Sequence, residues 1–168
     1  MTQTVLQNEI SELTPNTGVN IEGRRKVAAA IGDVMSDAFR LYVNTQGLHW
    51  NVEGPMFYSL HKLTEEQYRS IAESLDTMAE RMRALGLPAP ESLAEFETRS
   101  TIDDLPRDAD LKVRVERLVS DYEKAVVRLM RVAMLAEKNG DVKSADLLTE
   151  RIGAYEEFAW MLRASIVS

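Results

Sequence analysis

The chain has 168 residues, of which 45% are hydrophobic and 28% are charged, as is ordinary for a single soluble globular domain. Its formal net charge of −7 argues against tight binding to nucleic acid, because phosphate contacts need a basic surface, and it suits a protein that attracts cations. Cysteine is absent, which excludes disulfides, thiolate metal sites and cysteine nucleophiles and is consistent with a cytoplasmic location.

Residues 1–19 are expected to form an N-terminal tail that precedes a folded domain of residues 20–168. The first 13 residues have neither the basic nor the apolar region of a secretory signal, and the segment 15–18 contains helix-breaking Pro and Gly. The longest apolar runs, such as Val27–Ile31, are far too short to span a membrane.

The first predicted helix starts near Asn20, a favourable N-cap, with Glu22 in the first turn where the helix dipole favours an acid. Apolar residues then recur at steps of three and four, and the helix is expected to end between Gly47 and Trp50. A second amphipathic helix is predicted to begin with Pro55 at its first position and to stop at Gly86.

A short helix is expected over 91–98 and a linker over 100–106, followed by a third long helix from about Asp108 to Lys138. Asp141 can cap a fourth helix that continues to about Ile166. No segment alternates with period two, so no strand is predicted. The predicted fold is therefore an all-α four-helix bundle with a short extra helix in the middle connection, in which helices one and two form one hairpin and three and four the other.

The candidate functional residues lie around the connection between the first two helices. Both histidines of the chain, His49 and His61, occur here, and an antiparallel hairpin puts them at a similar level. Imidazoles with carboxylates form a ligand set suited to iron, zinc or manganese. Four candidate ligands share one face of the second helix within an arc of about 100°: His61, Glu65, Asp76 and Glu80.

One helix cannot bring all four side chains to one metal, since Glu65 and Asp76 are about 16 Å apart at 1.5 Å per residue. A second copy packed antiparallel about a two-fold axis near residues 70 and 71 would place His61 and Glu65 opposite Asp76 and Glu80 of its partner. The spacing therefore suggests two intersubunit metal sites for each dimer, with His49 joining from the first helix.

Simpler interpretations of the same residues remain open. Acidic residues on helices are usually just solvated, and His61 could form a surface pair with Glu65. The Glu-x-x-His motif of di-iron bundles is absent, because positions 46 and 58 are Gln46 and Tyr58. A metal-free helical scaffold is therefore an alternative.

Three motifs resemble the Dps proteins (DNA protection during starvation), which are ferritin-like mini-ferritins, and the resemblance covers nearly the whole chain. The motifs are His49-Trp50-Asn51-Val52-x-Gly54, Phe57-x-x-Leu60-His61 and Asp76-x-x-Ala79-Glu80-Arg81. The resemblance implies a ferritin-like shell of twelve subunits, a homo-oligomer built from two-fold dimers. It implies an iron-storing ferroxidase that oxidises Fe(II), preferentially with hydrogen peroxide, and keeps ferric mineral inside. Zinc or another divalent metal is possible at the same site.

By the same resemblance, His49, His61 and Glu65 would come from one subunit and Asp76 and Glu80 from its mate. The family usually has Asp where this chain has Glu65, which is one methylene longer. Trp50 and Trp160 are candidates for taking up stray oxidising equivalents, and ordinary core packing is the alternative for both. Three acidic residues early in the last helix are candidates for a cation-guiding pore: Asp141, Asp146 and Glu150.

A nucleoid-associated protein that protects DNA by coating it is the alternative function. Members of the family that bind DNA commonly use lysine-rich tails. Residues 1–23 here contain no Lys or Arg, and the last four residues are uncharged. We therefore expect DNA binding to be weak or absent.

Overall fold

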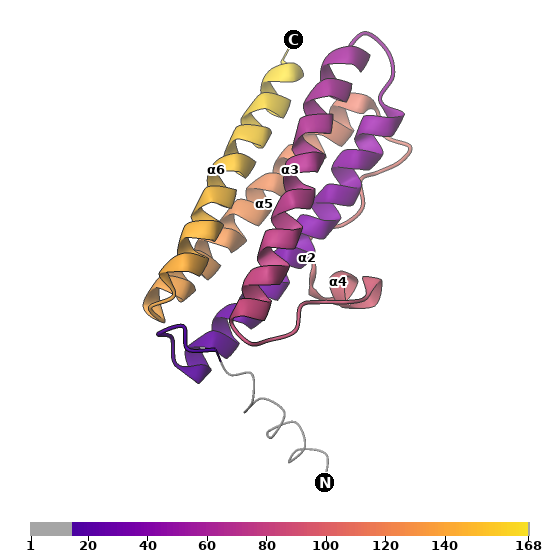
Figure 1. Cartoon of the computed structure of the whole chain (residues 1–168). Coiled ribbons are helices and arrows are strands. Elements are labelled where there is room, and N and C mark those ends of the chain that lie inside the picture. The colour runs from indigo at the N-terminus through magenta and orange to yellow at the C-terminus, as the bar shows by residue number, and fades with distance from the viewer. Residues whose placement is uncertain (1–14, 168) are drawn as a thin grey trace.

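The computed structural model describes residues 15–167, so most of the predicted tail over 1–19 lies outside the described residues. Four long helices lie side by side and a short helix sits at their flank (Figure 1). The long helices are α2 (Ile21–Asn51), α3 (Phe57–Ala84), α5 (Leu111–Lys138) and α6 (Val142–Ser165). Between α3 and α5 comes α4 (Leu93–Arg99), and residues 15–167 contain no strand. The predicted all-α bundle with a short helix in its middle connection is confirmed.

The helices pair as the sequence predicts. α2 packs against α3, and α5 packs against α6, while contacts between α2 and α5 and between α3 and α6 join the two hairpins. Asn20 caps α2 by accepting a hydrogen bond of 2.8 Å from the Gly23 amide. Asp141 caps α6 by accepting one of 3.0 Å from the Ser144 amide.

The start of α3 differs from the prediction. Pro55 does not occupy the first helical position but lies in a turn, closed by a 3.0 Å bond from the Phe57 amide to the Gly54 carbonyl. Gly54 has a φ of +85°, a left-handed conformation that favours glycine. Because of this left-handed glycine and the turn that follows it, helix α3 begins only at Phe57. Helix α5 likewise begins at Leu111, three residues after the predicted start.

The core is formed by apolar side chains from all four long helices and includes two fully buried tyrosines. The hydroxyls of Tyr122 and Thr45 lie 2.9 Å apart, while the Tyr122 and Tyr155 rings pack with centroids 5.3 Å apart. Burial raises the pKa of both phenols well above the ordinary value of a tyrosine. The largest fully buried apolar side chains are Ile31, Leu41, Leu48, Leu60, Ile71, Met78, Leu85, Leu118, Leu129 and Leu148.

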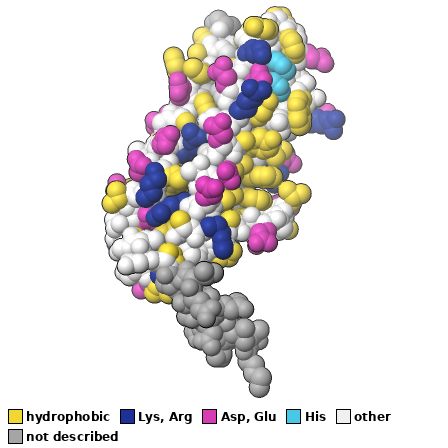
Figure 2. All heavy atoms as spheres, in the orientation of Figure 1, with side chains coloured by type: hydrophobic (Ala, Val, Ile, Leu, Met, Phe, Trp, Pro, Cys, Tyr) yellow, Lys and Arg dark blue, Asp and Glu magenta, His cyan; other side chains and the backbone are white. Residues whose placement is uncertain are grey.

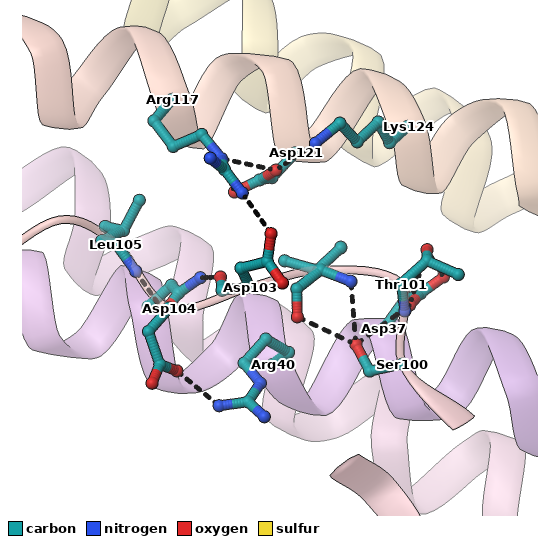
Figure 3. Close-up of polar contacts among 12 residues, drawn as sticks. Asp37, Arg40, Ser100, Thr101, Asp103, Asp104, Leu105, Arg117, Asp121 and Lys124 are labelled. Carbon is teal, nitrogen blue, oxygen red and sulfur yellow. Dashed lines mark hydrogen bonds and ion pairs between the residues drawn. The ribbon is translucent and has the colours of Figure 1, made fainter. Parts of the chain in front are cut away.

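The middle connection is bound to α2 by polar contacts, among them those between Asp37 and the segment at Ser100 and Thr101 (Figure 3). The buried Asp37 carboxylate accepts hydrogen bonds from the Thr101 amide at 2.6 Å and from Arg128 at 2.8 Å. Asn44 donates to the Asp103 carbonyl at 2.9 Å. These bonds hold the segment between α4 and α5 against the middle of α2.

Within residues 15–167, no helix combines the length and the apolar character that crossing a membrane requires.

Candidate metal centre

His49 in the last turn of α2 and His61 in the first turns of α3 lie face to face. Their rings stack with centroids 3.8 Å apart and planes inclined by 17°. His49 is buried, and His61 is partly exposed. Histidine atoms reach the surface near one end of the bundle, beside basic and acidic side chains (Figure 2). The hairpin therefore brings both histidines to one level, as their spacing around the turn predicts.

Each histidine is fixed by the main chain of the other. His49 Nδ1 lies 2.8 Å from the His61 carbonyl oxygen, and His61 Nδ1 lies 2.9 Å from the His49 carbonyl oxygen. A carbonyl oxygen can only accept, so both Nδ1 atoms carry the proton and donate. In the neutral rings both Nε2 atoms therefore keep a lone pair. This tautomer is the one that a histidine needs to bind a metal through Nε2.

Aromatic side chains surround the two imidazoles. The Phe57 ring stacks on His61 with a centroid distance of 5.1 Å, and Tyr68 meets His49 edge to face at the same distance. The sequence-based prediction of the site does not include Tyr68. Helical spacing contains a signal, since Phe57 and Tyr68 lie one turn before and two turns after His61. These rings help to hold the imidazoles in place.

Glu65 lies one turn after His61, and its carboxylate is already engaged by two cations. Lys62 Nζ donates to Oε2 at 2.9 Å, and Arg69 Nη2 donates to Oε1 at 2.6 Å. The hydrogen bond from Lys62 is the largest cause that holds the pKa of Glu65 below its usual value. The sequence-based alternative, a surface pair between His61 and Glu65, does not form, because the carboxylate pairs with these two cations.

Asp76 and Glu80 lie further along the same unbroken helix, beyond the level of the histidines. Because α3 is continuous, Asp76 is about 16 Å from Glu65 along the axis, and Glu80 is about 28 Å from His61. Within residues 15–167 of one chain, no three His, Asp or Glu side chains converge into a group that could hold a metal ion. One chain thus brings the histidines together and leaves Asp76 and Glu80 apart from them.

The tryptophans and the pore candidates take different positions. Trp50 and Trp160 are 67% and 61% exposed, so the alternative of ordinary core packing is wrong for both in the single chain. Asp141 is buried as the N-cap of α6 and accepts a 2.6 Å bond from Arg81. Asp146 is exposed beside Lys143, and Glu150 is also exposed. Of the three acids, only Asp146 and Glu150 are accessible to passing cations.

Known proteins share both the sequence pattern and the fold of this chain. A family model described as a ferritin-like domain matches residues 28–167. The chain is 35% identical over 153 residues to an uncharacterized low temperature-induced protein of Nostoc sp., covering 90% of this chain and 86% of the relative. It is 31% identical over 140 residues to DNA protection during starvation protein 2 of Bacillus anthracis, covering 83% of this chain and 96% of the relative.

Solved structures agree with the sequence relatives. The Dps protein of Vibrio cholerae O1 superposes with a TM-score of 0.83 at 26% identity, covering 90% of this chain and 96% of the other. That protein is described as a member of a broad superfamily of ferritin-like diiron-carboxylate proteins.

Proposed function

This chain belongs to the Dps family of ferritin-like proteins, and from that premise we propose that it is a ferroxidase that oxidises Fe(II) and stores the ferric product. The observation that carries the proposal is the reciprocal pair of histidine bonds. Both Nδ1 atoms donate to carbonyl oxygens, at 2.8 and 2.9 Å, so both Nε2 atoms are available as ligands in one place.

The complete site is shared between two chains. His49, His61 and Glu65 of one subunit would bind iron together with Asp76 and Glu80 of a second subunit, related by a two-fold axis. Association between chains is supported by large apolar side chains that a single chain leaves exposed on all five helices, since apolar surfaces commonly mark interfaces. They include Val43, Trp50, Phe57, Tyr58 and Leu93.

The chemistry follows from the ligand set. Carboxylates stabilise ferric iron more than ferrous iron because their negative charge interacts more strongly with the higher cation charge. Two ferrous ions would supply the two electrons that break the O–O bond of one hydrogen peroxide molecule, giving two ferric ions and two hydroxide ions. Consumption of peroxide in this way avoids release of hydroxyl radical, and it would protect the cell and its DNA.

Assembly is part of the proposal. The ferric mineral would collect inside a shell of twelve subunits in the cytoplasm, and twelve chains of 19.0 kDa would total about 228 kDa. Exposed Asp146 and Glu150 are proposed to attract incoming cations at pores in this shell.

The test is oxidation of Fe(II) by stoichiometric hydrogen peroxide in the absence of oxygen, followed by ferric absorbance. The double variant His49→Ala with His61→Ala should oxidise iron at least about tenfold more slowly than the parent, because the site loses both of its nitrogen ligands. Equal rates in shells of equal size would show that the histidines are not the site.

Protection of DNA by coating is the competing function, and the charge of the chain opposes it. We expect no retardation of plasmid DNA in a gel at neutral pH and ordinary salt. A clear shift would establish coating as an activity of this chain.

A further inference from the structure

We infer that Lys62 and Arg69 compete with the metal for Glu65, and so set the affinity of the proposed iron site. The inference rests on the proposed function and concerns its regulation. We define the three residues Lys62, Glu65 and Arg69 as the Glu65 cluster. Both carboxylate oxygens of Glu65 accept a hydrogen bond from a cation, at 2.9 Å from Lys62 and 2.6 Å from Arg69. An incoming metal therefore meets a carboxylate whose negative charge is already shared with two cations, and this weakens the attraction between carboxylate and metal.

The positions around α3 show the direction of this competition. At 100° per residue, His61 lies about 40° to one side of Glu65, whereas Arg69 and Lys62 lie about 40° and 60° to the other. The two cations therefore draw the carboxylate away from the side of the helix that carries His61. A metal bound at His61 Nε2 needs the carboxylate to turn toward that side.

The Glu65 cluster is built so that it can open. The side chains of Lys62 and Arg69 are 54% and 65% exposed, so both cations can move into water when the carboxylate leaves. Glu65 itself is only 21% exposed. Exposed pairs of this kind are weak, so a divalent cation can displace them, but their loss still subtracts from metal affinity.

The additional methylene of Glu65 gives the competition its chemical basis. A glutamate side chain has the reach to contact residues three and four positions away on a helix, as in the pairs with Lys62 and Arg69. Asp at this position would hold its carboxylate closer to the helix axis.

The experiment measures binding of Co(II), a redox-inert probe here in the absence of peroxide, to the full-length assembled protein by isothermal titration calorimetry. The double variant Lys62→Met with Arg69→Met should bind Co(II) about twofold to tenfold more tightly than the parent. This range corresponds to the free energy of two exposed ion pairs, with which the metal no longer has to compete. Lys26→Met is the matched control, because Lys26 forms an exposed pair with Glu22 on α2 that is not part of the cluster. It should change the affinity less than about twofold.

A double-mutant cycle separates competition for Glu65 from the general effect of removing positive charge. In the Glu65→Gln background the same two Met substitutions should change the affinity less than about twofold, because glutamine carries no charge for which the cations compete. An equal gain in both backgrounds would overturn the inference, since the cations would then act only through long-range repulsion. No gain in the parent background would also overturn it.

Failure of the proposed function has a different signature. If His49→Ala with His61→Ala binds Co(II) as tightly as the parent, the histidine site itself is wrong and the cluster has nothing to regulate. If the histidine variant loses binding while the cycle shows no coupling, the site stands and only the competition is wrong.

Discussion

Single side chains in this protein are fixed by partners that a sequence pattern does not reveal. The tautomer of both imidazoles is set by carbonyl groups of the main chain, so no acidic residue is needed for that role. Tyr122 and Tyr155 illustrate the same point in the core, where burial and not a charged neighbour is the largest cause of their raised pKa. Burial of a phenol favours its neutral form.

The raised pKa of Tyr155 predicts how stability depends on pH. Since the folded pKa lies above the unfolded value of about 10, the folded state binds more protons above pH 10, and stability falls as pH rises. Tyr155→Phe removes this loss of stability at high pH. The hydroxyl of Tyr155 makes no hydrogen bond within residues 15–167, so the substitution breaks none there. The variant should match the parent at pH 7 within about 1 kcal/mol. Above pH 10 it should gain up to about 1.4 kcal/mol per pH unit relative to the parent.

Urea unfolding at pH 7, 9 and 11, at one protein concentration, checks this prediction. A constant difference between Tyr155→Phe and the parent across this range would contradict the assignment.

At the scale of elements, a buried carboxylate of α2 contributes to the position of the middle connection. Asp37 lies within an amphipathic helix, where an acidic residue usually faces solvent, yet it is buried and binds groups 64 and 91 residues away. Neighbouring Asp33, by contrast, is partly exposed and pairs with Arg99 and Arg128 at 3.2 and 3.3 Å. The two residues offer a matched comparison on one helix.

Asp37→Ala should destabilise the protein by about 3 kcal/mol, because it leaves the Thr101 amide and Arg128 without their buried acceptor. Asp33→Ala should cost less than about 1 kcal/mol, as expected of exposed ion pairs. Chemical denaturation of both variants gives the two free energies of unfolding. Equal losses would mean that Asp37 is not the anchor of the connection.

Local signals account for most of what the sequence predicts about these elements. The caps Asn20 and Asp141 and the three- and four-residue apolar steps depend on neighbours along the chain, and both caps are confirmed. The prediction that Pro55 opens α3 is wrong by two residues, because the left-handed Gly54 opens a turn first. The roles of Asp37 and Asn44 could not be predicted, since their partners come from distant segments that only the folded chain brings near.

The candidate site also has a part that the sequence predicts and a part that it does not. His49 and His61 lie at similar distances from the turn between α2 and α3, so the sequence predicts that the two side chains lie close together. The engagement of Glu65 by Lys62 and Arg69 is not among the predictions, although i,i+3 and i,i+4 spacing allows it. The joining of Asp76 and Glu80 to the histidines stays a prediction, because it needs a second chain.

For the whole molecule, a site shared across a two-fold axis predicts complementation between defective subunits. One variant would carry His49→Ala with His61→Ala, and the other Asp76→Ala with Glu80→Ala. Each alone should be inactive. In a mixed dimer, one of the two sites would take its histidines and its acids from intact halves, so random mixing should restore about a quarter of all sites.

Co-refolding of the two variants in equal amounts, followed by peroxide-driven Fe(II) oxidation, measures this recovery. Separately refolded shells mixed afterwards are the control, because their subunits have already assembled. Absence of recovery in co-refolded shells of normal size would show that the site does not draw its ligands from two subunits.

The reciprocal histidine bonds also bear on the order in which the protein is made. His49 and His61 are separated by 12 residues and belong to the first hairpin of the chain. Contacts that are close in sequence form quickly, and N-terminal segments emerge first from the ribosome. The nitrogen half of the site can therefore be in place on a nascent chain while α5 and α6 are still being translated. The acidic half comes only from a second chain, so iron chemistry would wait until two chains have associated and assembly of the container for its product has begun.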